Sequence, residues 1–542
     1  MLNLKYEDWK SVCEMHLSQK NNRLRNYLQW YPIYNNKGIN FDDTGYFYKY
    51  INNGSFSILK GFTIRTDNYI QKGDGSFRKS SLLSPSLYLI LQTIGKTIYD
   101  SYKSERPEDI IVYYAGNYST MDCFYKKSYD SFYKDINYFI ENYSYYIKTD
   151  IRDFFNNINV NKLFSQIDKQ QKKDNNVCLN PLQLQIFKDL ILYTGNEGFP
   201  LVENSMASSY LATEIYLDPI DTRLYDFLKE SGYIEDFKMV RYVDDLYIFI
   251  KEDHYNDTFV NNMIINEYSS ILKNYNLSLN NTKTSIGTID TIDTDLKKSM
   301  YDEVVNEKRF QIPELASDNC LYVFLDKLCK MLEERNSITK EEYNNIMKEA
   351  FTIENIEFTY REIFNYFAFE KIQPRDINIK ERMSKISALF KYADLSFVSF
   401  DPKQLMTIIL STEDGSICKK ILNYLFVRSK QGLWNAYDTS IAINYLLKRR
   451  FQYEDLITQI KKHDKKLYDY FYCCKNTIQE EAEEEAERLR RICLKINVSD
   501  TTYYLYFMYY VELDRNNIMS AFAYFKNFFD RVTAELDFYV KK

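Results

Sequence analysis

The spacing of apolar residues predicts a hairpin and a helix in the first part of the chain. The segment IQKGDGSFRKSSLLSP places a Gly-Asp-Gly turn between two short strand-like stretches, which is typical of a β-hairpin. After Pro85, the segment LYLILQTIGKTIYDSYK carries apolar residues at helical spacing. Because proline favours the first turn of a helix, we expect a helix that begins at Pro85.

From about residue 137 to residue 291 the pattern changes to alternating strands and helices. The apolar segments YYIKTDI and FKMVRYVDDLYIFI predict buried strands, the second with a turn near its centre. Between them, NSMASSYLATEIYLDPIDTRLYDFLKE has a helical period, and Asn204 or Ser205 is a suitable N-cap. This part of the chain is therefore predicted to be a domain of mixed strands and helices.

Beyond residue 292 the chain favours helix throughout and contains few prolines and glycines. Short amphipathic segments at similar intervals suggest a stack of helix pairs, although no clean repeat consensus is present. The acidic run IQEEAEEEAERLRR is interpreted as a solvated or connecting helix without a catalytic role. We therefore predict three regions, 1–136, 137–291 and an all-α region 292–542.

Composition and charge narrow the class of protein. A chain of 542 residues exceeds what one hydrophobic core usually serves, and 45% hydrophobic residues argue against long disorder. The formal net charge is −6, so any groove that holds a phosphate backbone must be locally basic. The 51 tyrosines are weak evidence for nucleic-acid stacking, because an AT-rich genome over-uses tyrosine.

The sequence predicts neither a membrane protein nor a zinc protein. No uninterrupted apolar stretch approaches the ~18 residues that cross a membrane, and the first residues do not form a secretory signal. Nine cysteines without a C-x-x-C pair and only 3 histidines give no zinc pattern. We expect a cytoplasmic protein with reduced thiols.

Three aspartates carry the candidate chemistry. The segment YVDDL puts Asp244 and Asp245 at the tip of the second apolar hairpin, and Asp150 ends the upstream strand about ninety residues earlier. Adjacent carboxylates repel one another unless water or a cation compensates them. Phosphoryl transfer uses two ions held by carboxylates from neighbouring strands. An exposed Asp-Asp turn and a simple strand-end cap are the alternatives.

These segments resemble the reverse-transcriptase family, in which an aspartate followed by Phe-Phe forms the first palm motif and Tyr-x-Asp-Asp the third. The resemblance covers about residues 78–286 and implies an α+β fold of fingers and palm with an antiparallel palm sheet, followed by the helical half. It implies that Asp150 and Asp244 bind both ions, that the Ile151 carbonyl helps one of them, and that Asp245 supports the site. The implied ions are two Mg²⁺, with Mn²⁺ as a substitute.

Other residues receive roles from the same resemblance. Phe155 matches the steric-gate position that excludes a ribose 2′ hydroxyl and so implies deoxynucleotides, although Phe154 and Phe155 also suit a core. Lys283, in NLSLNNTKTSI, matches a lysine that approaches the triphosphate and protonates the leaving pyrophosphate, or is an exposed turn lysine. Arg78 and Lys79 either clamp the triphosphate or are ordinary surface charge.

The second palm motif departs from the family pattern. The family reads Gly-x-Pro-x-Gly before a helix that supports template and nucleotide, and residues 198–200 here begin well with Gly-Phe-Pro. Asn204 and Ser205, however, stand where the family has Gln-Gly or Thr-Gly. A missing glycine limits close backbone approach, so ordinary template gripping is in doubt. Asn204, Ser205 and Tyr242 are the remaining predicted substrate-binding positions.

An altered second motif before a long helical half resembles the bacterial antiphage reverse transcriptases of the abortive-infection (AbiK-like) and defence-associated group. The resemblance implies DNA synthesis from dNTPs in phage defence, template-independent and protein-primed, with single-stranded DNA attached to a tyrosine. Copying of a partner non-coding RNA and a catalytically silent nucleic-acid sensor are the alternatives. A homo-oligomer is also expected.

Particular residues disfavour two alternatives, the silent sensor and a ribonuclease. A dead site would have no physical reason to keep repelling carboxylates together, which argues against the silent sensor. A HEPN-type ribonuclease in the helical half would use an Arg-x-x-x-x-His arrangement. Because His16, His254 and His463 do not lie in one, we set this interpretation aside.

Overall fold

The computed structural model describes residues 1–18, 28–35, 40–58, 63–71, 77–173, 179–292, 319–353, 359–368, 379–392, 394–410, 414–434, 436–449, 452–475 and 491–542. The predicted Gly-Asp-Gly turn and nearly all of the acidic run fall outside these residues. The chain divides into two compact units. The first comprises Met1–Asp67, Ser80–Asp295 and Tyr472–Lys542, and the second Asn68–Lys79 and Leu296–Phe471. The three predicted regions remain a prediction.

A five-stranded sheet organises the first unit. Its order is β3 (Ile110–Tyr113), β5 (Phe237–Tyr242), β6 (Asp245–Ile250), β4 (Tyr145–Asp150) and β7 (Ser285–Gly287). The apolar runs that predicted β4, β5 and β6 are buried along most of their length. Strand β6 is antiparallel to both of its neighbours, β5 and β4, and Asp150 of β4 lies directly opposite Asp245 of β6.

One strand pair differs from the antiparallel sheet that we predicted. Strand β3 runs parallel to β5, with Tyr113 opposite Tyr242. More than a hundred residues separate the two strands in sequence, which gives the chain room for the crossover that a parallel pair requires. A hydrophobic pattern read locally contains no signal for this partner.

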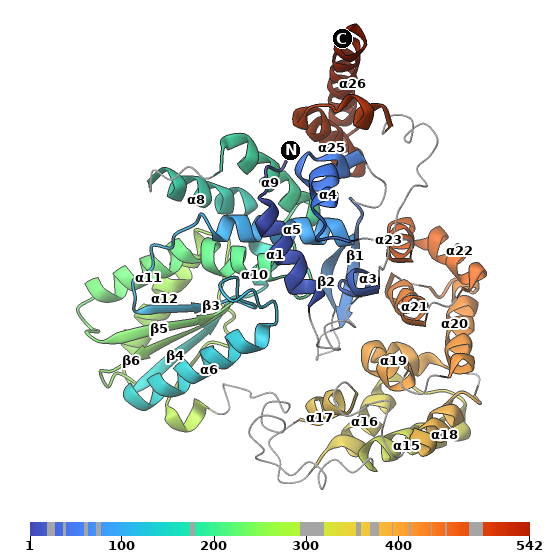
Figure 1. The fold of residues 1–542 in the computed structure, drawn as a ribbon. Helices are drawn as coiled ribbons and strands as arrows, with labels where there is room; N and C mark the ends of the chain where they lie inside the picture. The colour runs from blue at the N-terminus through green and yellow to red at the C-terminus, as the bar shows by residue number, and fades with distance from the viewer. Residues whose placement is uncertain are drawn as a thin grey trace. The chain divides into compact units, whose positions relative to one another are not determined.

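Helices cover both faces of the sheet. Figure 1 shows α6 (Tyr125–Asn142) on one face and α11 (Asp218–Glu230) and α12 (Thr258–Lys273) on the other. Phe132 of α6 packs its ring against Tyr242 and Tyr247 at centroid distances of 5.4 and 5.8 Å. Both faces of the central strands are therefore buried, which explains their nearly continuous apolar sequence.

The remaining helices of the first unit come from the N-terminal, central and C-terminal parts of the chain. The predicted helix is present as α5 (Pro85–Tyr99), and Ser205 caps α10 as expected. Its helices, apart from those already named, are α1 (Tyr6–Leu17), α3 (Tyr31–Asn35), α4 (Thr44–Tyr46), α7 (Phe154–Asn157), α8 (Val160–Lys173), α9 (Pro181–Thr194), α10 (Met206–Tyr210), α25 (Asp500–Asp514) and α26 (Ile518–Lys541).

All regular secondary structure that the structure describes within residues 319–471 is helical, which confirms the helical C-terminal region. Phe324, Tyr343, Phe351 and Phe364 form an aromatic cluster within it. The helix-pair repeat remains a prediction. The helices are α15 (Asn319–Arg335), α16 (Lys340–Phe351), α17 (Tyr360–Tyr366), α18 (Ile379–Leu389), α19 (Pro402–Leu410), α20 (Gly415–Lys430), α21 (Ala436–Arg449), α22 (Glu454–His463) and α23 (Lys465–Lys475).

The strands of a short hairpin contain residues that are assigned to both units. Its strands, β1 (Arg65–Gln71) and β2 (Phe77–Leu83), pair with each other as the sequence predicts. Within the described part of the chain, no helix combines the length and the apolar character needed to cross a membrane.

Candidate active site

The turn between β5 and β6 carries the paired aspartates and is held in an unusual conformation. Val243 has a φ of +54°, a left-handed value that is rare for a β-branched residue. Its N–H donates to the Tyr113 carbonyl at 3.0 Å, and its carbonyl accepts from Arg241 Nη1 at 3.3 Å. The strained turn is thus held from both sides, which fixes where Asp244 follows it.

Asp150 lies opposite this turn, at the end of β4, and is held by residues near β7. Asn280 Nδ2 donates to Asp150 Oδ1 at 2.8 Å, and Lys283 Nζ donates to Asp150 Oδ2 at 2.8 Å. Ile151 forms an isolated bridge with Leu279, which aligns this segment with the end of β4. The structure therefore brings Asp150, Asp245 and Lys283 together from positions far apart in sequence.

The carboxylates of the site repel one another. Burial raises the pKa of Asp244 to about 7, and the neighbouring Asp245 and Asp150 carboxylates add to the shift. Burial and Asp150 likewise raise the pKa of Asp245. The hydrogen bond to Asp150 raises the pKa of Lys283 and keeps it charged. One lysine leaves a net negative site, which a cation would stabilise.

The donor atoms suit a hard divalent cation. Carboxylate oxygens are the ligands that Mg²⁺ takes in proteins, and Asp150, Asp244 and Asp245 supply them. No group of three or more His, Cys, Asp or Glu side chains among the described residues is arranged to hold a metal ion. In the structure, Asn280 donates to one carboxylate oxygen of Asp150 and Lys283 donates to the other. The chemistry of the donors, together with the raised pKa of Asp244, fits Mg²⁺.

Family comparisons agree with this geometry. Residues 70–312 match the model of the reverse transcriptase (RNA-dependent DNA polymerase). The chain carries a reverse transcriptase domain. Such a domain implies nucleotidyltransferase chemistry in residues 70–312. Residues 312–472 match a domain of unknown function (DUF8609), and residues 490–542 match the HEPN-like AbiA C-terminal domain. No curated protein matches the chain.

Solved structures similar to the chain include telomerases. Those from Candida albicans and Candida Tropicalis, each in complex with a TWJ fragment of telomeric RNA, are 13% and 14% identical, with TM-scores of 0.27 and 0.29. The matches cover 70% and 72% of this chain but 65% of each telomerase chain. Apo telomerase from Candida Tropicalis is 12% identical, with a TM-score of 0.29 and coverages of 76% and 69%.

The AbiA-type match changes the interpretation of the C-terminal segment. The positions of the three histidines of the chain led us to set aside a HEPN-type ribonuclease, yet residues 490–542 match a HEPN-like domain. That segment contains no histidine, so histidine-dependent ribonuclease chemistry has no residue to use there. The chain thus combines a match to a reverse transcriptase domain with a match to an AbiA-type HEPN-like domain.

The two phenylalanines that follow Asp150 occupy different environments in the reverse transcriptase domain. Phe154 is 2% exposed and belongs to the core. Phe155 is only half-buried, and its ring lies 6.2 Å from the ring of Phe199, at an interplanar angle of 30°. Phe199 is buried and therefore backs Phe155. This leaves Phe155 as the ring of the pair that is able to meet a substrate.

Asn204 and Ser205 form a turn at the start of α10. Ser205 is buried, and its hydroxyl accepts from Gln92 Nε2 at 2.8 Å and from the Ser208 N–H at 3.1 Å. Asn204 has a φ of +56°, and its carbonyl accepts from the Tyr88 hydroxyl at 3.2 Å. Ser205 is thus bound into the core of the domain, and the substrate-binding roles of both residues stay a prediction.

The other predicted residues are Tyr242, Arg78 and Lys79. The Tyr242 ring packs against Tyr129 at 5.2 Å and against Phe132 on α6, and burial raises its pKa. Arg78 and Lys79 are exposed on β2, within the stretch 68–79 that groups with the second unit. Their role at the triphosphate remains a prediction.

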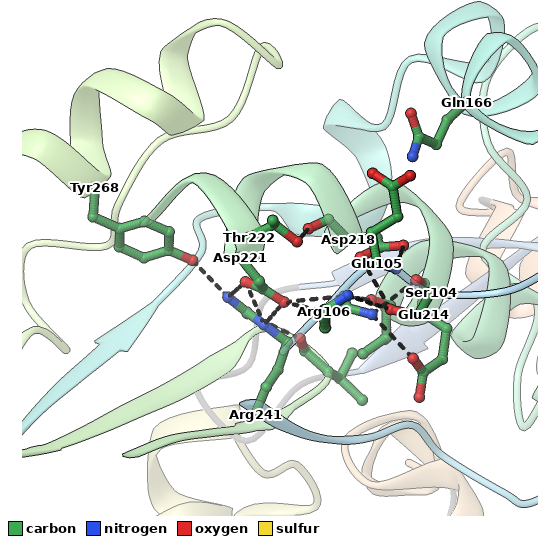
Figure 2. A network of polar contacts seen from close by, with 12 residues as sticks. Ser104, Glu105, Arg106, Gln166, Glu214, Asp218, Asp221, Thr222, Arg241 and Tyr268 are labelled. Atoms are coloured by element: carbon green, nitrogen blue, oxygen red, sulfur yellow. Dashed lines mark hydrogen bonds and ion pairs between the residues drawn. The ribbon is translucent and has the colours of Figure 1, made fainter. Parts of the chain in front are cut away.

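A buried charge network behind the hairpin was not predicted from the sequence. Asp221 of α11 accepts from Arg241 Nη2 at 2.6 Å and from Arg106 Nε at 3.0 Å, and neither Asp221 nor Arg241 has an exposed side chain (Figure 2). Arg241 also donates to the Tyr268 hydroxyl at 2.8 Å. Because Arg241 contacts the Val243 carbonyl, this network supports the aspartate turn. The feature of the sequence that could have indicated this network is Arg241, an arginine inside a predicted apolar strand.

Asn280 is a second residue that the sequence did not single out, although it lies in the segment that contains Lys283. It engages both the side chain and the main-chain carbonyl of Asp150. Replacing Asn280 with Asp would set a carboxylate against Asp150, and we expect roughly a 10- to 100-fold loss of nucleotide incorporation. Asn281→Asp, at the exposed neighbouring position, is the matched control. Equal rates for both variants in a labelled-nucleotide assay would contradict this role.

Proposed function

We propose that the chain is a Mg²⁺-dependent DNA polymerase of antiphage abortive infection that adds deoxynucleotides. The observation that carries the proposal is the meeting of Asp150 and Asp245 across β4 and β6, with Asp244 at the adjoining turn and Lys283 on Asp150. Carboxylates from two strands and one lysine are the groups that two-metal nucleotidyl transfer requires. The reverse transcriptase match over residues 70–312 supports the same chemistry.

Each residue has a defined task in the proposed reaction. Asp150, Asp244 and the Ile151 carbonyl would hold the ions, and Asp245 would support the site. When bound, the ions activate the attacking hydroxyl and neutralise the leaving pyrophosphate. The hydroxyl oxygen bonds to the α-phosphorus as the bond to pyrophosphate breaks, and the hydroxyl proton passes to solvent. Lys283 is charged, because its pKa is raised, and can protonate the pyrophosphate.

Nucleotide choice is assigned to Phe155. Its half-buried ring, backed by Phe199, would leave no space for a ribose 2′ hydroxyl. The proposed substrates are therefore dNTPs. The valine variant Phe155→Val is expected to accept ribonucleotides, which a comparison of dNTP and rNTP incorporation would test.

We further propose that synthesis is template-independent and primed by a protein hydroxyl. The support is the second motif, where Ser205 replaces glycine and is tied to Gln92 and Ser208 in the core. By the resemblance, position 205 is where the family's backbone approaches the template. The AbiA-like match over residues 490–542 supports the role in abortive infection. A partner non-coding RNA as template is the alternative, favoured by the family description as an RNA-dependent polymerase.

One experiment separates these modes. The purified chain is incubated with Mg²⁺ and each labelled dNTP in turn, without added nucleic acid, and is run on a denaturing gel before and after protease. Label that moves with the protein until protease releases it is the expected result. Label that appears only after RNA is added would overturn template independence and favour the RNA-templated alternative.

A further inference from the structure

The loop that follows α9 is closed tightly on itself. Asn196 and Glu197 both have left-handed φ values, +54° and +73°. A Cβ placed on Gly195 would lie 2.2 Å from the Gly198 carbonyl oxygen and 2.7 Å from the Phe199 carbonyl carbon, so the backbone of Phe199 rests directly on Gly195. Arg65 Nη2 donates to Asn196 Oδ1 at 2.8 Å. Because these contacts restrict the conformation of the loop, a change in the position of the end of α9 is expected to change the position of Phe199.

Helix α25, from the HEPN-like segment, holds the end of α9. The buried ring of Tyr193 packs edge-on against Phe507 at 5.5 Å and against Tyr510 at 6.1 Å. About one turn earlier on both helices, the Tyr504 hydroxyl donates to Asp189 Oδ2 at 2.6 Å. α25 therefore contacts the helix from which the tight loop emerges, along the last two turns of that helix.

An ion pair links the end of α25 directly to the loop. Arg515 Nε lies 3.1 Å from Glu197 Oε1, and Arg515 Nη1 also bonds to Glu512 at 3.0 Å. The Arg515 side chain is 26% exposed, and that of Glu197 is 64% exposed. Glu197 is two residues from Phe199, whose ring backs Phe155 at 6.2 Å. A continuous set of contacts thus leads from the C-terminal helices to Phe155.

We propose that the C-terminal helix pair α25 and α26 is a positioning element for nucleotide selection, and that Arg515 is its positioning residue. Arg515 and the rings on α25 fix the Gly195–Pro200 loop, the loop fixes Phe199, and Phe199 fixes the ring of Phe155. The HEPN-like segment thereby serves the polymerase site of its own chain. The inference rests on the proposed function, because the gate role of Phe155 is part of it.

The test measures dNTP against rNTP incorporation, with the same base, by the full chain. Arg515→Gln and Glu197→Gln are each expected to lower the dNTP preference about two- to fivefold, the effect of one partly exposed ion pair. Gly195→Ala, which must displace Phe199, should lower it more than tenfold. Lys526→Gln, which breaks the exposed Lys526–Asp530 pair on α26, is the matched control and should change nothing.

The outcomes distinguish this inference from the proposed function. If Phe155→Val lowers the preference while Arg515→Gln, Glu197→Gln and Gly195→Ala do not, the positioning inference is overturned and the polymerase proposal remains. If Phe155→Val leaves the preference unchanged, the set of contacts ends at the wrong residue and the inference is overturned as well. A wild-type chain that incorporates no nucleotide, with or without RNA, would overturn the proposed function and the inference together.

Discussion

Asp244→Asn is expected to reduce deoxynucleotide incorporation by about a thousandfold or more, because losing a metal-binding carboxylate removes several kcal/mol of transition-state stabilisation. The fold should remain intact. Burial and two neighbouring carboxylates raise the pKa of Asp244 to about 7, so an uncharged side chain of the same shape relieves repulsion. Incorporation of labelled dNTP and thermal unfolding, measured on the same preparation, check both parts. Phage protection should be lost together with incorporation.

A matched control tests whether the effect is specific to the active site or follows from the loss of any carboxylate. Asp253→Asn removes one exposed carboxylate shortly after β6 and should leave incorporation and protection unchanged. If Asp244→Asn still protects cells against phage, the catalytic account of defence is wrong. If the Asp244→Asn variant protects cells and also still incorporates nucleotide, Asp244 is not a metal ligand and the assignment of the hairpin fails.

Asp221→Asn is expected to lower the free energy of unfolding by about 3–5 kcal/mol, because it leaves buried guanidinium groups without their shared carboxylate. Asp221 accepts from both Arg106 and Arg241, and neither Asp221 nor Arg241 has an exposed side chain. Incorporation should fall as well, since Arg241 holds the Val243 carbonyl beside Asp244. Urea unfolding and nucleotide incorporation are the measurements.

Two comparisons show whether the charge pair is responsible. Asp226→Asn lies on the exposed side of the same helix and should cost little. In a double-mutant cycle, Asp221→Leu combined with Arg241→Met should be less destabilising than the sum of the single variants, because the pair is removed together. Additive effects would show that Asp221 and Arg241 do not depend on each other.

The parts of the fold that could be predicted are those with a local cause. Strands β4, β5 and β6 follow from apolar runs, the aspartate turn from paired polar residues between two of them, and the helix at Pro85 from the fixed φ of proline. The N-cap at Ser205 follows from a hydroxyl placed before a helical period.

The parts that could not be predicted depend on contacts between distant residues. Arg106 and Asp221 are 115 positions apart, and Tyr504 and Asp189 are 315 apart, so neither pair leaves a periodic trace in the sequence. The parallel pairing of β3 with β5 has the same origin. Asn280 was overlooked because an asparagine in a turn has many ordinary uses, and only the register of Ile151 with Leu279 sets it beside Asp150.

The most direct test of the central claim is anomalous diffraction from crystals of the chain soaked with Mn²⁺ and a non-hydrolysable deoxynucleoside triphosphate. Mn²⁺ takes the same oxygen ligands as Mg²⁺ and is visible by its anomalous signal. The account predicts ion peaks bound by Asp150 and Asp244, with Lys283 moved from Asp150 toward the triphosphate. Peaks at other residues only, with Lys283 still on Asp150 and the nucleotide bound elsewhere, would contradict it.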